Sequence, residues 1–201
     1  MTASTQHLTL PNKITIGRIL LIPLFVLVCI DYIRSCSHGH PQEWERILAC
    51  AIFALAAVSD AVDGYIARRY HQKSELGTFL DPLADKALLV SALILLSRDN
   101  GDAFEQLPLW FPVLVISRDA ILLAGTVLIH IVAGHARSQP RIVGKCATFF
   151  QMITLGWVLL KIEHPPFNWP MITAGVFTFI SGVWYIFDGV KQLNAPATKP
   201  A

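Results

Sequence analysis

Residues 47–85 read ILACAIFALAAVSDAVDGYIARRYHQKSELGTFLDPLAD. Every residue from 47 to 59 is apolar or small and uncharged, which is typical of a helix that lies in hydrocarbon. Four aspartates follow, at positions 60, 63, 81 and 85. Because a carboxylate inside a membrane segment costs on the order of 2.5–3.5 kcal/mol, four of them require a compensating cation and a water-filled cavity.

The spacing of the four aspartates predicts a metal site. Asp60 and Asp63 are three residues apart and Asp81 and Asp85 are four apart, so each pair shares one face of a helix. Two such helices facing each other gather four oxygen ligands. Mg²⁺ and Mn²⁺ prefer carboxylates and water to nitrogen or sulfur. We therefore expect Asp60, Asp63, Asp81 and Asp85 to bind one of these ions.

The small and basic residues between the acids also have chemical interpretations. Gly64 and Ala67 remove bulk so that a nucleotide can approach the backbone, although small residues also serve tight helix packing in membranes. Arg68 can bind a phosphate through its forked guanidinium. Gly77 allows a sharp turn, and the Asp81-Pro82 pair predicts the start of the next helix.

The composition indicates an integral membrane protein. Of the 201 residues, 54% are hydrophobic and only 15% are charged, whereas soluble domains carry about 25% charged residues. The length suits a single domain over residues 1–201. Because each membrane crossing must satisfy its own backbone hydrogen bonds, we expect an all-α bundle of six transmembrane helices. The six apolar stretches are 14–33, 46–69, 79–98, 107–134, 143–162 and 170–190.

The distribution of basic residues predicts the orientation in the membrane. With the N-terminus in the cytoplasm, eleven of the 16 Lys and Arg residues lie in inner segments and four in outer loops, and Arg118 falls within a helix. Both termini, and the end of the bundle where the aspartates open, are therefore expected to face the cytoplasm. The net charge of +2 without a long basic run argues against a nucleic-acid partner. No signal or transit peptide is evident, which favours a bacterial plasma (inner) membrane as the location.

The pattern DxxDGxxAR, then eight residues, then GxxxDxxxD, resembles the signature of the CDP-alcohol phosphatidyltransferases, and every fixed position is filled. The resemblance implies a homodimeric membrane enzyme in which an alcohol displaces CMP from CDP-diacylglycerol with the help of two Mg²⁺ or Mn²⁺ ions. It implies that Asp85 acts as the general base. The residues implied to bind the CDP-lipid are Asp60, Gly64, Ala67, Arg68 and Gly77.

A motif near the N-terminus bears on the acceptor alcohol. Asn12, Thr15 and Arg18 form an NxxTxxR pattern that resembles the first helix of phosphatidylglycerophosphate synthases within this family. The spacing keeps the three residues on a shared face at the cytoplasmic end of the helix. In the alternative interpretation Asn12 caps the helix and Arg18 anchors it at the membrane interface.

A second group of basic residues predicts an acceptor that carries phosphate. Arg118 lies deep in an apolar stretch, so its charge should meet Asp119, the motif aspartates or a substrate phosphate. With Arg141 and Lys145 it forms a basic cluster that favours glycerol 3-phosphate as the acceptor. Structural ion pairing of Arg118 is the alternative.

Parts of the sequence are compatible with two other functions. The run GK-x-x-T-x-x-Q at 144–151 resembles phosphatidylglycerophosphate synthases, but SRD-x-x-L at 117–122 resembles cardiolipin synthases of the same family, whose acceptor is phosphatidylglycerol. Intramembrane acids also mark ion transporters. A transporter would not require Gly64, Ala67 and Arg68 at these offsets, and the sequence has no internal repeat.

Overall fold

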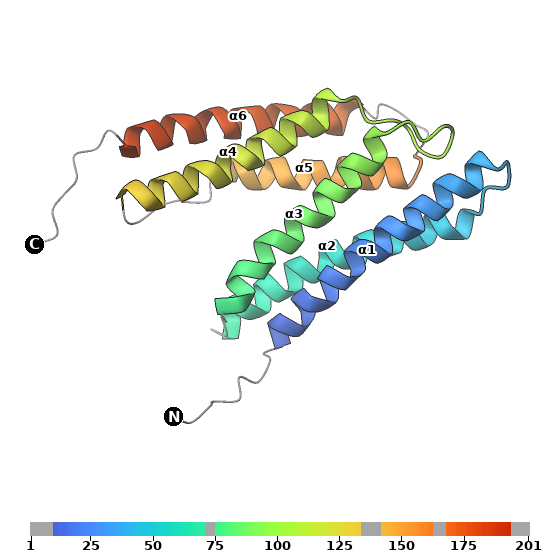
Figure 1. The fold of residues 1–201 in the computed structure, drawn as a ribbon, viewed down its shortest axis with the longest axis horizontal. Helices are drawn as coiled ribbons and strands as arrows, with labels where there is room; N and C mark the ends of the chain where they lie inside the picture. Colours follow the sequence, from blue (N-terminus) through green and yellow to red (C-terminus); the bar gives the residue numbers. More distant parts are fainter. Residues whose placement is uncertain (1–9, 71–74, 134–141, 163–167, 194–201) are drawn as a thin grey trace, which may run out of the picture. The chain divides into compact units, whose positions relative to one another are not determined.

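The computed structural model describes residues 10–70, 75–133, 142–162 and 168–193, and within these ranges the chain forms six helices and no strand (Figure 1). The helices are α1 (Leu10–Ser37), α2 (Glu43–Tyr70), α3 (Glu75–Ser97), α4 (Trp110–Ala133), α5 (Ile142–Leu159) and α6 (Asn168–Leu193). Each of the six predicted apolar stretches corresponds to one of these helices, so the all-helical prediction is confirmed. The orientation of the termini stays a prediction.

Three helices of the described part are long and apolar enough to cross a membrane. They are α1 over Ile16–Ser37, α5 over Ile142–Leu159 and α6 over Trp169–Gly189. Large apolar side chains such as Leu20, Leu123 and Phe187 remain 67–70% exposed on the helices. Such faces suit contact with lipid, as expected for a membrane protein.

The predicted start of the third helix was wrong. α3 begins at Glu75, so Gly77 lies in its first turn and the Asp81-Pro82 pair lies in its second turn. An acidic residue at the first position is favourable for the helix dipole, which supports the earlier start. Pro82 removes one backbone hydrogen bond, but membrane helices tolerate proline where neighbouring groups satisfy the freed carbonyl.

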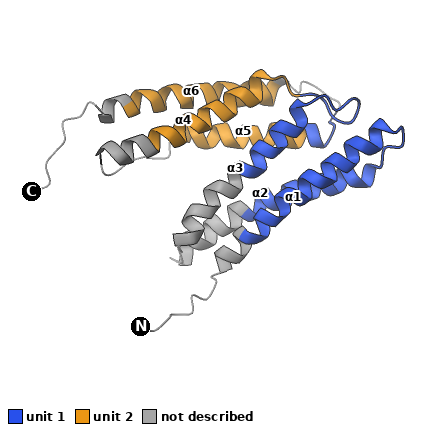
Figure 2. Ribbon diagram, viewed as in Figure 1, with its two compact units in different colours: residues 1–106, 158–162 blue, residues 107–157, 163–201 orange. Residues whose placement is uncertain are grey.

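The chain divides into two compact units (Figure 2). Unit 1 comprises residues 1–106 and 158–162, and therefore holds α1, α2 and α3. Unit 2 comprises residues 107–157 and 163–201, and holds α4, most of α5, and α6.

In unit 1, α1 and α2 form an antiparallel hairpin. Gly39 closes the turn with a φ of 76°, a left-handed conformation that glycine adopts without strain. Its N–H donates to the Cys36 carbonyl at 3.0 Å, as in a helix C-terminal cap. The rings of Phe25 and Phe53 lie 5.6 Å apart between the two helices. The fully buried Ala49 lies one turn before Phe53, where a small side chain lets the helices approach closely.

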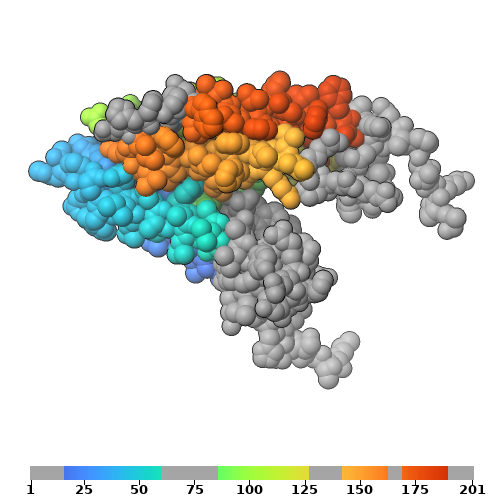
Figure 3. Space-filling model, turned by 180° about the vertical axis from the view of Figure 1, so that it is seen from behind, coloured from blue at the N-terminus to red at the C-terminus, as the bar shows by residue number. Residues whose placement is uncertain are grey.

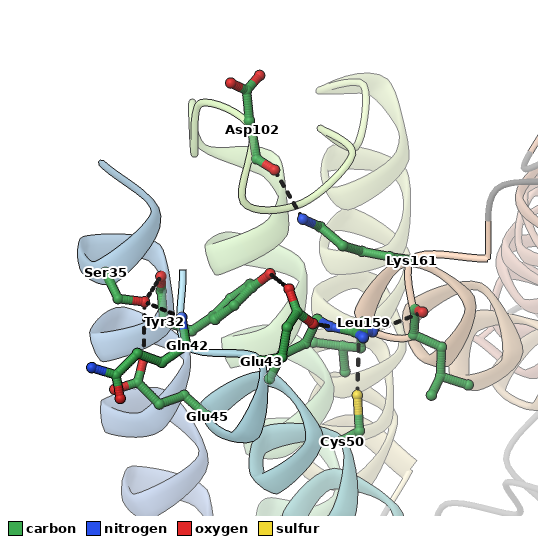
Figure 4. A network of polar contacts seen from close by, with 11 residues as sticks. Tyr32, Ser35, Gln42, Glu43, Glu45, Cys50, Asp102, Leu159 and Lys161 are labelled. Carbon is green, nitrogen blue, oxygen red and sulfur yellow. Dashed lines mark hydrogen bonds and ion pairs between the residues drawn. The ribbon is translucent and has the colours of Figure 1, made fainter. Parts of the chain in front are cut away.

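A polar network joins the segments at the hairpin end of unit 1 (Figure 4). The Tyr32 hydroxyl donates to Glu43 Oε1 at 3.3 Å, and the Ser35 hydroxyl donates to Glu45 Oε2 at 3.0 Å. Lys161 Nζ lies 5.5 Å from the centre of the Tyr32 ring and donates to the Asp102 carbonyl at 3.0 Å. Cations over an aromatic face are attracted by the ring quadrupole.

Side chains of α2 also satisfy carbonyls at the end of α5. The Cys50 thiol donates to the Leu159 carbonyl at 3.3 Å, and Arg46 Nη1 donates to the Leu160 carbonyl at 2.9 Å. Arg46 Nε meanwhile donates to Glu43 Oε2 at 2.7 Å. The last carbonyls of a helix have no intrahelical partner, and a cation near them also complements the helix dipole. Arg46 therefore donates hydrogen bonds both to a carboxylate and to a carbonyl at the end of a helix.

In unit 2, small residues mark the points where helices meet. A Cβ added to Gly175 of α6 would lie 2.9 Å from the Trp110 ring of α4, and one added to Gly125 of α4 would lie 2.8 Å from the Tyr185 ring of α6. Close contact at glycines is the usual means by which membrane helices pack. α5 and α6 lie side by side (Figure 3), with the rings of Phe150 and Phe177 stacked at 5.7 Å.

We predict that Arg46→Met destabilises the protein by about 1–2 kcal/mol, because it removes a charge-assisted bond to Glu43 and a donor from the end of α5. The thermal unfolding midpoint of the full-length protein in detergent measures this loss. Arg98→Met, at an exposed position, is the matched control and should leave the midpoint unchanged. Equal midpoints for the two variants would contradict the proposed role of Arg46.

The pH dependence gives an independent check on the same contact. The hydrogen bond from Arg46 lowers the pKa of the Glu43 carboxyl below its ordinary value of 4.5. A carboxylate with a lowered folded-state pKa stabilises the fold above its unfolded pKa, and this contribution is lost as the pH falls through the folded-state value. Between about pH 5 and pH 3 the wild type should therefore lose more stability than Arg46→Met does.

Candidate active site

The four motif aspartates lie on two consecutive helices of unit 1. Asp60 and Asp63 belong to the second half of α2, and Asp81 and Asp85 to the first half of α3. Both pairs are thus spaced along continuous helices, as the sequence predicted. α2 and α3 contact each other. The carboxylate positions lie outside the described residues, so their coordination of a metal stays a prediction.

The other motif residues are placed at the level of the backbone. Gly64, Ala67 and Arg68 are in the last turns of α2, and Gly77 is in the first turn of α3. These residues flank the connection over 71–74. Their side-chain surroundings lie outside the described residues, and the binding of the CDP-lipid by these positions is not tested by the geometry.

The N-terminal motif lies on α1. Asn12 and Thr15 fall in its first two turns, with their side chains outside the described residues. Arg18 is described, and it is only 1% exposed. A guanidinium that anchors a helix at the interface extends to the head groups, whereas this one is enclosed by protein. Its burial therefore argues against interface anchoring as the role of Arg18.

Arg118 is a buried cation of unit 2. It lies in α4 with 9% of its surface exposed. Its Nη1 donates to Asp119 Oδ1 at 2.8 Å, and its Nη2 donates to Ser181 Oγ of α6 at 2.8 Å. Of the three partners expected for the Arg118 charge, which were Asp119, the motif aspartates and a substrate phosphate, the structure shows Asp119. Both side chains of this ion pair are shielded, with 10% and 13% exposed.

The sequence did not indicate the contact with Ser181. The serine is 63 residues from Arg118 in the chain, and one hydroxyl in an apolar helix is not unusual. The Ser181-Gly182 pair inside the apolar run of α6 was the only feature of the sequence that indicated a polar contact there. A Cβ added to Gly182 would lie 3.5 Å from Cγ of Arg118, so the stem of the arginine packs against α6 there.

The remaining acceptor-site candidates are less well defined. Lys145 lies in the first turn of α5 and is exposed. Arg141 lies outside the described residues. The structure therefore describes only part of the predicted basic cluster, and it does not test the binding of an acceptor phosphate.

Two polar residues of the run 144–151 contribute to helix packing. Gln151 is 1% exposed, and its Nε2 donates to Thr178 Oγ1 of α6 at 2.8 Å. The Thr148 hydroxyl donates to the Gly144 carbonyl, four residues earlier, at 3.2 Å. Buried polar groups need such partners because an unsatisfied group in an apolar interior is costly.

Comparison with known proteins defines the class of this chain. The family model for CDP-alcohol phosphatidyltransferases matches residues 8–184, which include helices of both units and the whole aspartate motif. The chain belongs to the CDP-alcohol phosphatidyltransferase family. It is therefore a membrane transferase, in agreement with its composition and its three apolar helices.

Two bacterial relatives share one name, CDP-diacylglycerol–glycerol-3-phosphate 3-phosphatidyltransferase. The protein from Pseudomonas fluorescens is 33% identical over 192 residues, which cover 94% of this chain and 90% of the relative. The protein from Escherichia coli strain K12 is 31% identical over 190 residues, which cover 94% of this chain and 96% of the relative. The similarity thus extends over nearly the whole of all three proteins.

We predict that Asp119→Asn destabilises the protein by about 2 kcal/mol, because a neutral amide replaces the largely shielded carboxylate that accepts from Arg118. Thermal unfolding in detergent measures the change. Asp99→Asn is the matched control, since Asp99 is exposed and accepts from the Gly101 N–H at 3.1 Å, a bond that an asparagine oxygen can keep. An Asp119→Asn variant as stable as the control would show that the ion pair does not support the fold.

Proposed function

We propose that this protein transfers the phosphatidyl group of CDP-diacylglycerol to glycerol 3-phosphate, with release of CMP and formation of phosphatidylglycerophosphate. The observation that carries the proposal is the similarity, at 31–33% identity over 94% of the chain, to relatives named for this transfer. The intact DxxDGxxAR and GxxxDxxxD motifs support the same chemistry.

Asp60, Asp63, Asp81 and Asp85 are proposed to hold two Mg²⁺ or Mn²⁺ ions. The donor set fits these ions, because it consists of four carboxylates at helical spacing on α2 and α3 and includes no nitrogen or sulfur ligand. Divalent ions bound there would neutralise the pyrophosphate and stabilise the departing CMP. Metal dependence is part of the proposal.

The motif residues are proposed to bind the donor and to move one proton. Arg68 donates to a phosphate oxygen of the CDP-lipid, while Gly64, Ala67 and Gly77 leave room for the nucleotide beside the backbone. Asp85 takes the proton from the acceptor hydroxyl. The acceptor oxygen then bonds to the phosphorus that carries diacylglycerol, and the bond from that phosphorus to the bridging oxygen breaks, so that CMP leaves with the electron pair.

Arg118 and Lys145, together with Arg141, are proposed to bind the phosphate of the acceptor. The shielding of Arg118 supports this role, because a charge-assisted bond to phosphate is stronger where water is excluded. Asn12, Thr15 and Arg18 are proposed to contribute from α1. Arg18, like Arg118, is buried, which is unusual for arginine outside ion pairs and binding sites.

The proposed setting is a bacterial plasma membrane. All six helices would cross the bilayer, with both termini and the aspartate motif on the cytoplasmic side, as the distribution of basic residues predicts. Glycerol 3-phosphate and CMP are water-soluble, so the cytoplasmic orientation gives them direct access. The functional form is proposed to be a homodimer, as the family resemblance implies.

Phosphatidylglycerol is the alternative acceptor, which would make the protein a cardiolipin synthase. The SRD-x-x-L run at 117–122 favours this alternative. In this run the acid that follows the arginine is an aspartate, Asp119. Since the two functions share the donor and the aspartate motif, only the acceptor distinguishes them.

Purified protein is expected to release CMP from CDP-diacylglycerol when glycerol 3-phosphate and Mg²⁺ or Mn²⁺ are present. EDTA should abolish the release, because the pyrophosphate charge would then lack compensation. Parallel reactions with glycerol 3-phosphate and with phosphatidylglycerol identify the acceptor. Release of CMP only with phosphatidylglycerol would establish the alternative, and release that persists in EDTA would refute metal dependence.

Asp85→Asn is expected to lower kcat by about 10²–10⁴-fold, because an amide cannot accept the proton of the acceptor hydroxyl. Its KM for CDP-diacylglycerol should change little, since the amide oxygen retains the size of the carboxylate. Glu75→Gln, at the start of the same helix, is the control and should keep wild-type turnover. Wild-type rates in Asp85→Asn would remove Asp85 from the role of base.

A further inference from the structure

Three helices of unit 2 meet at the guanidinium of Arg118. α4 carries the arginine, and α6 provides Ser181, whose hydroxyl oxygen accepts from Nη2 at 2.8 Å. α5 provides Gly144, where an added Cβ would lie 2.7 Å from Nη2 and 3.4 Å from Ser181 Oγ. The guanidinium therefore lies against the backbone of α5 at a residue that has no side chain.

While the Arg118 guanidinium keeps this position, no residue with a side chain fits at position 144. Real Cβ atoms essentially never lie within 3.0 Å of another heavy atom, so even alanine would displace Nη2 and disturb its bond to Ser181. Glycine is also the poorest helix former after proline. A glycine inside α5 is thus explained by the guanidinium that it accommodates.

The hydrogen-bond partner of Ser181 differs from those of Thr173 and Thr178 in the same helix. Thr173 and Thr178 of α6 donate to the carbonyls four residues earlier, at 2.8 and 2.6 Å. Such bonds satisfy the hydroxyl within its own helix. Thr178 also accepts from Gln151 of α5, whereas the Ser181 hydroxyl has no bond within its own helix among the described residues and accepts from an arginine on another helix.

The hydrogen bonds to Asp119 and Ser181 fix the plane of the Arg118 guanidinium, and they use only some of its N–H donors. A guanidinium has five N–H donors, of which Asp119 and Ser181 each accept one. Nε of Arg118 is buried and has no hydrogen-bond partner among the described residues. A phosphate oxygen is the type of acceptor that an arginine with spare donors binds best.

We infer that Ser181 and Gly144 are positioning residues, which hold the Arg118 guanidinium in the orientation that binds the phosphate of the acceptor alcohol. The inference rests on the proposed function, in which Arg118 binds that phosphate. Neither residue touches the substrate. Ser181 acts through its hydrogen bond to Nη2, and Gly144 acts through the room that it leaves.

Gly144→Ala and Gly156→Ala test the steric part. Both substitutions add one methyl group to α5 and favour the helix, but a Cβ at Gly156 has no heavy atom of the described residues within 4 Å. Gly144→Ala should raise the KM for glycerol 3-phosphate about 10-fold without raising the KM for CDP-diacylglycerol or lowering the unfolding temperature. Gly156→Ala should match the wild type in all three measurements.

Ser181→Ala and Ser181→Thr test the hydrogen bond. Alanine removes the acceptor and should raise the KM for glycerol 3-phosphate about 10-fold, whereas threonine retains a hydroxyl and should stay within about 3-fold of the wild type. Loss of this charge-assisted bond is also expected to lower the unfolding temperature, so a purely structural role is recognised by a rise in the KM of both substrates. The unfolding temperature of each variant is therefore measured with the kinetics.

The outcomes separate this inference from the proposed function. If the wild type releases no CMP with glycerol 3-phosphate, the proposed function fails and the inference fails with it. If the wild type is active but Gly144→Ala behaves as Gly156→Ala does, or Ser181→Ala as Ser181→Thr does, the positioning role alone is overturned. An equal rise in the KM of both substrates also overturns it.

Discussion

The cost of placing charge among apolar helices is the constraint on which this structure depends. Hydrocarbon offers no water to an ionised side chain, so each charge must find its partner within the protein or in a ligand. Arg118 and Asp119 show one solution, an ion pair between neighbouring residues that is completed by a hydroxyl from α6. At the hairpin end of unit 1, Arg46 satisfies both a carboxylate and a helix end. The four motif aspartates present the same problem with the opposite sign, which is the physical reason to expect cations there.

Glycines in the helices of unit 2 serve both close helix packing and a polar contact. Gly175 and Gly125 admit the rings of Trp110 and Tyr185 between α4 and α6, as is common where membrane helices cross. Gly144 is different, because the group that it admits is a guanidinium. A glycine in a membrane helix can therefore serve a polar contact, and its neighbours decide which kind of contact it serves.

The helices could be predicted from sequence because hydropathy is a local property of the chain. Each apolar stretch satisfies its own backbone hydrogen bonds, so six stretches gave six helices with boundaries within a few residues. The start of α3 was misjudged because Gly77 and the Asp81-Pro82 pair are ordinary boundary signals elsewhere. Within the aspartate motif they belong to a continuous helix.

The partners of the buried arginine show a second limit of sequence reasoning. Asp119 was predictable because it is adjacent to Arg118, but Ser181 is 63 residues away and no local pattern relates the two. Only the packing of α4 against α6 brings them together. The aspartate motif, in contrast, was recognised from spacing alone, since its eight fixed positions lie within 26 residues of the chain.

The chemical nature of Ser181 bears on whether Arg118 can still attract an anion. Asp119 already balances the charge of the guanidinium. A second carboxylate at position 181 would hold Nη2 at least as firmly, but it would give the cluster a net negative charge and repel a phosphate. A hydroxyl fixes the geometry and adds no charge, so Ser181 does not reduce the electrostatic potential of the guanidinium further. Positioning by a neutral group is therefore the arrangement that is compatible with binding an anion.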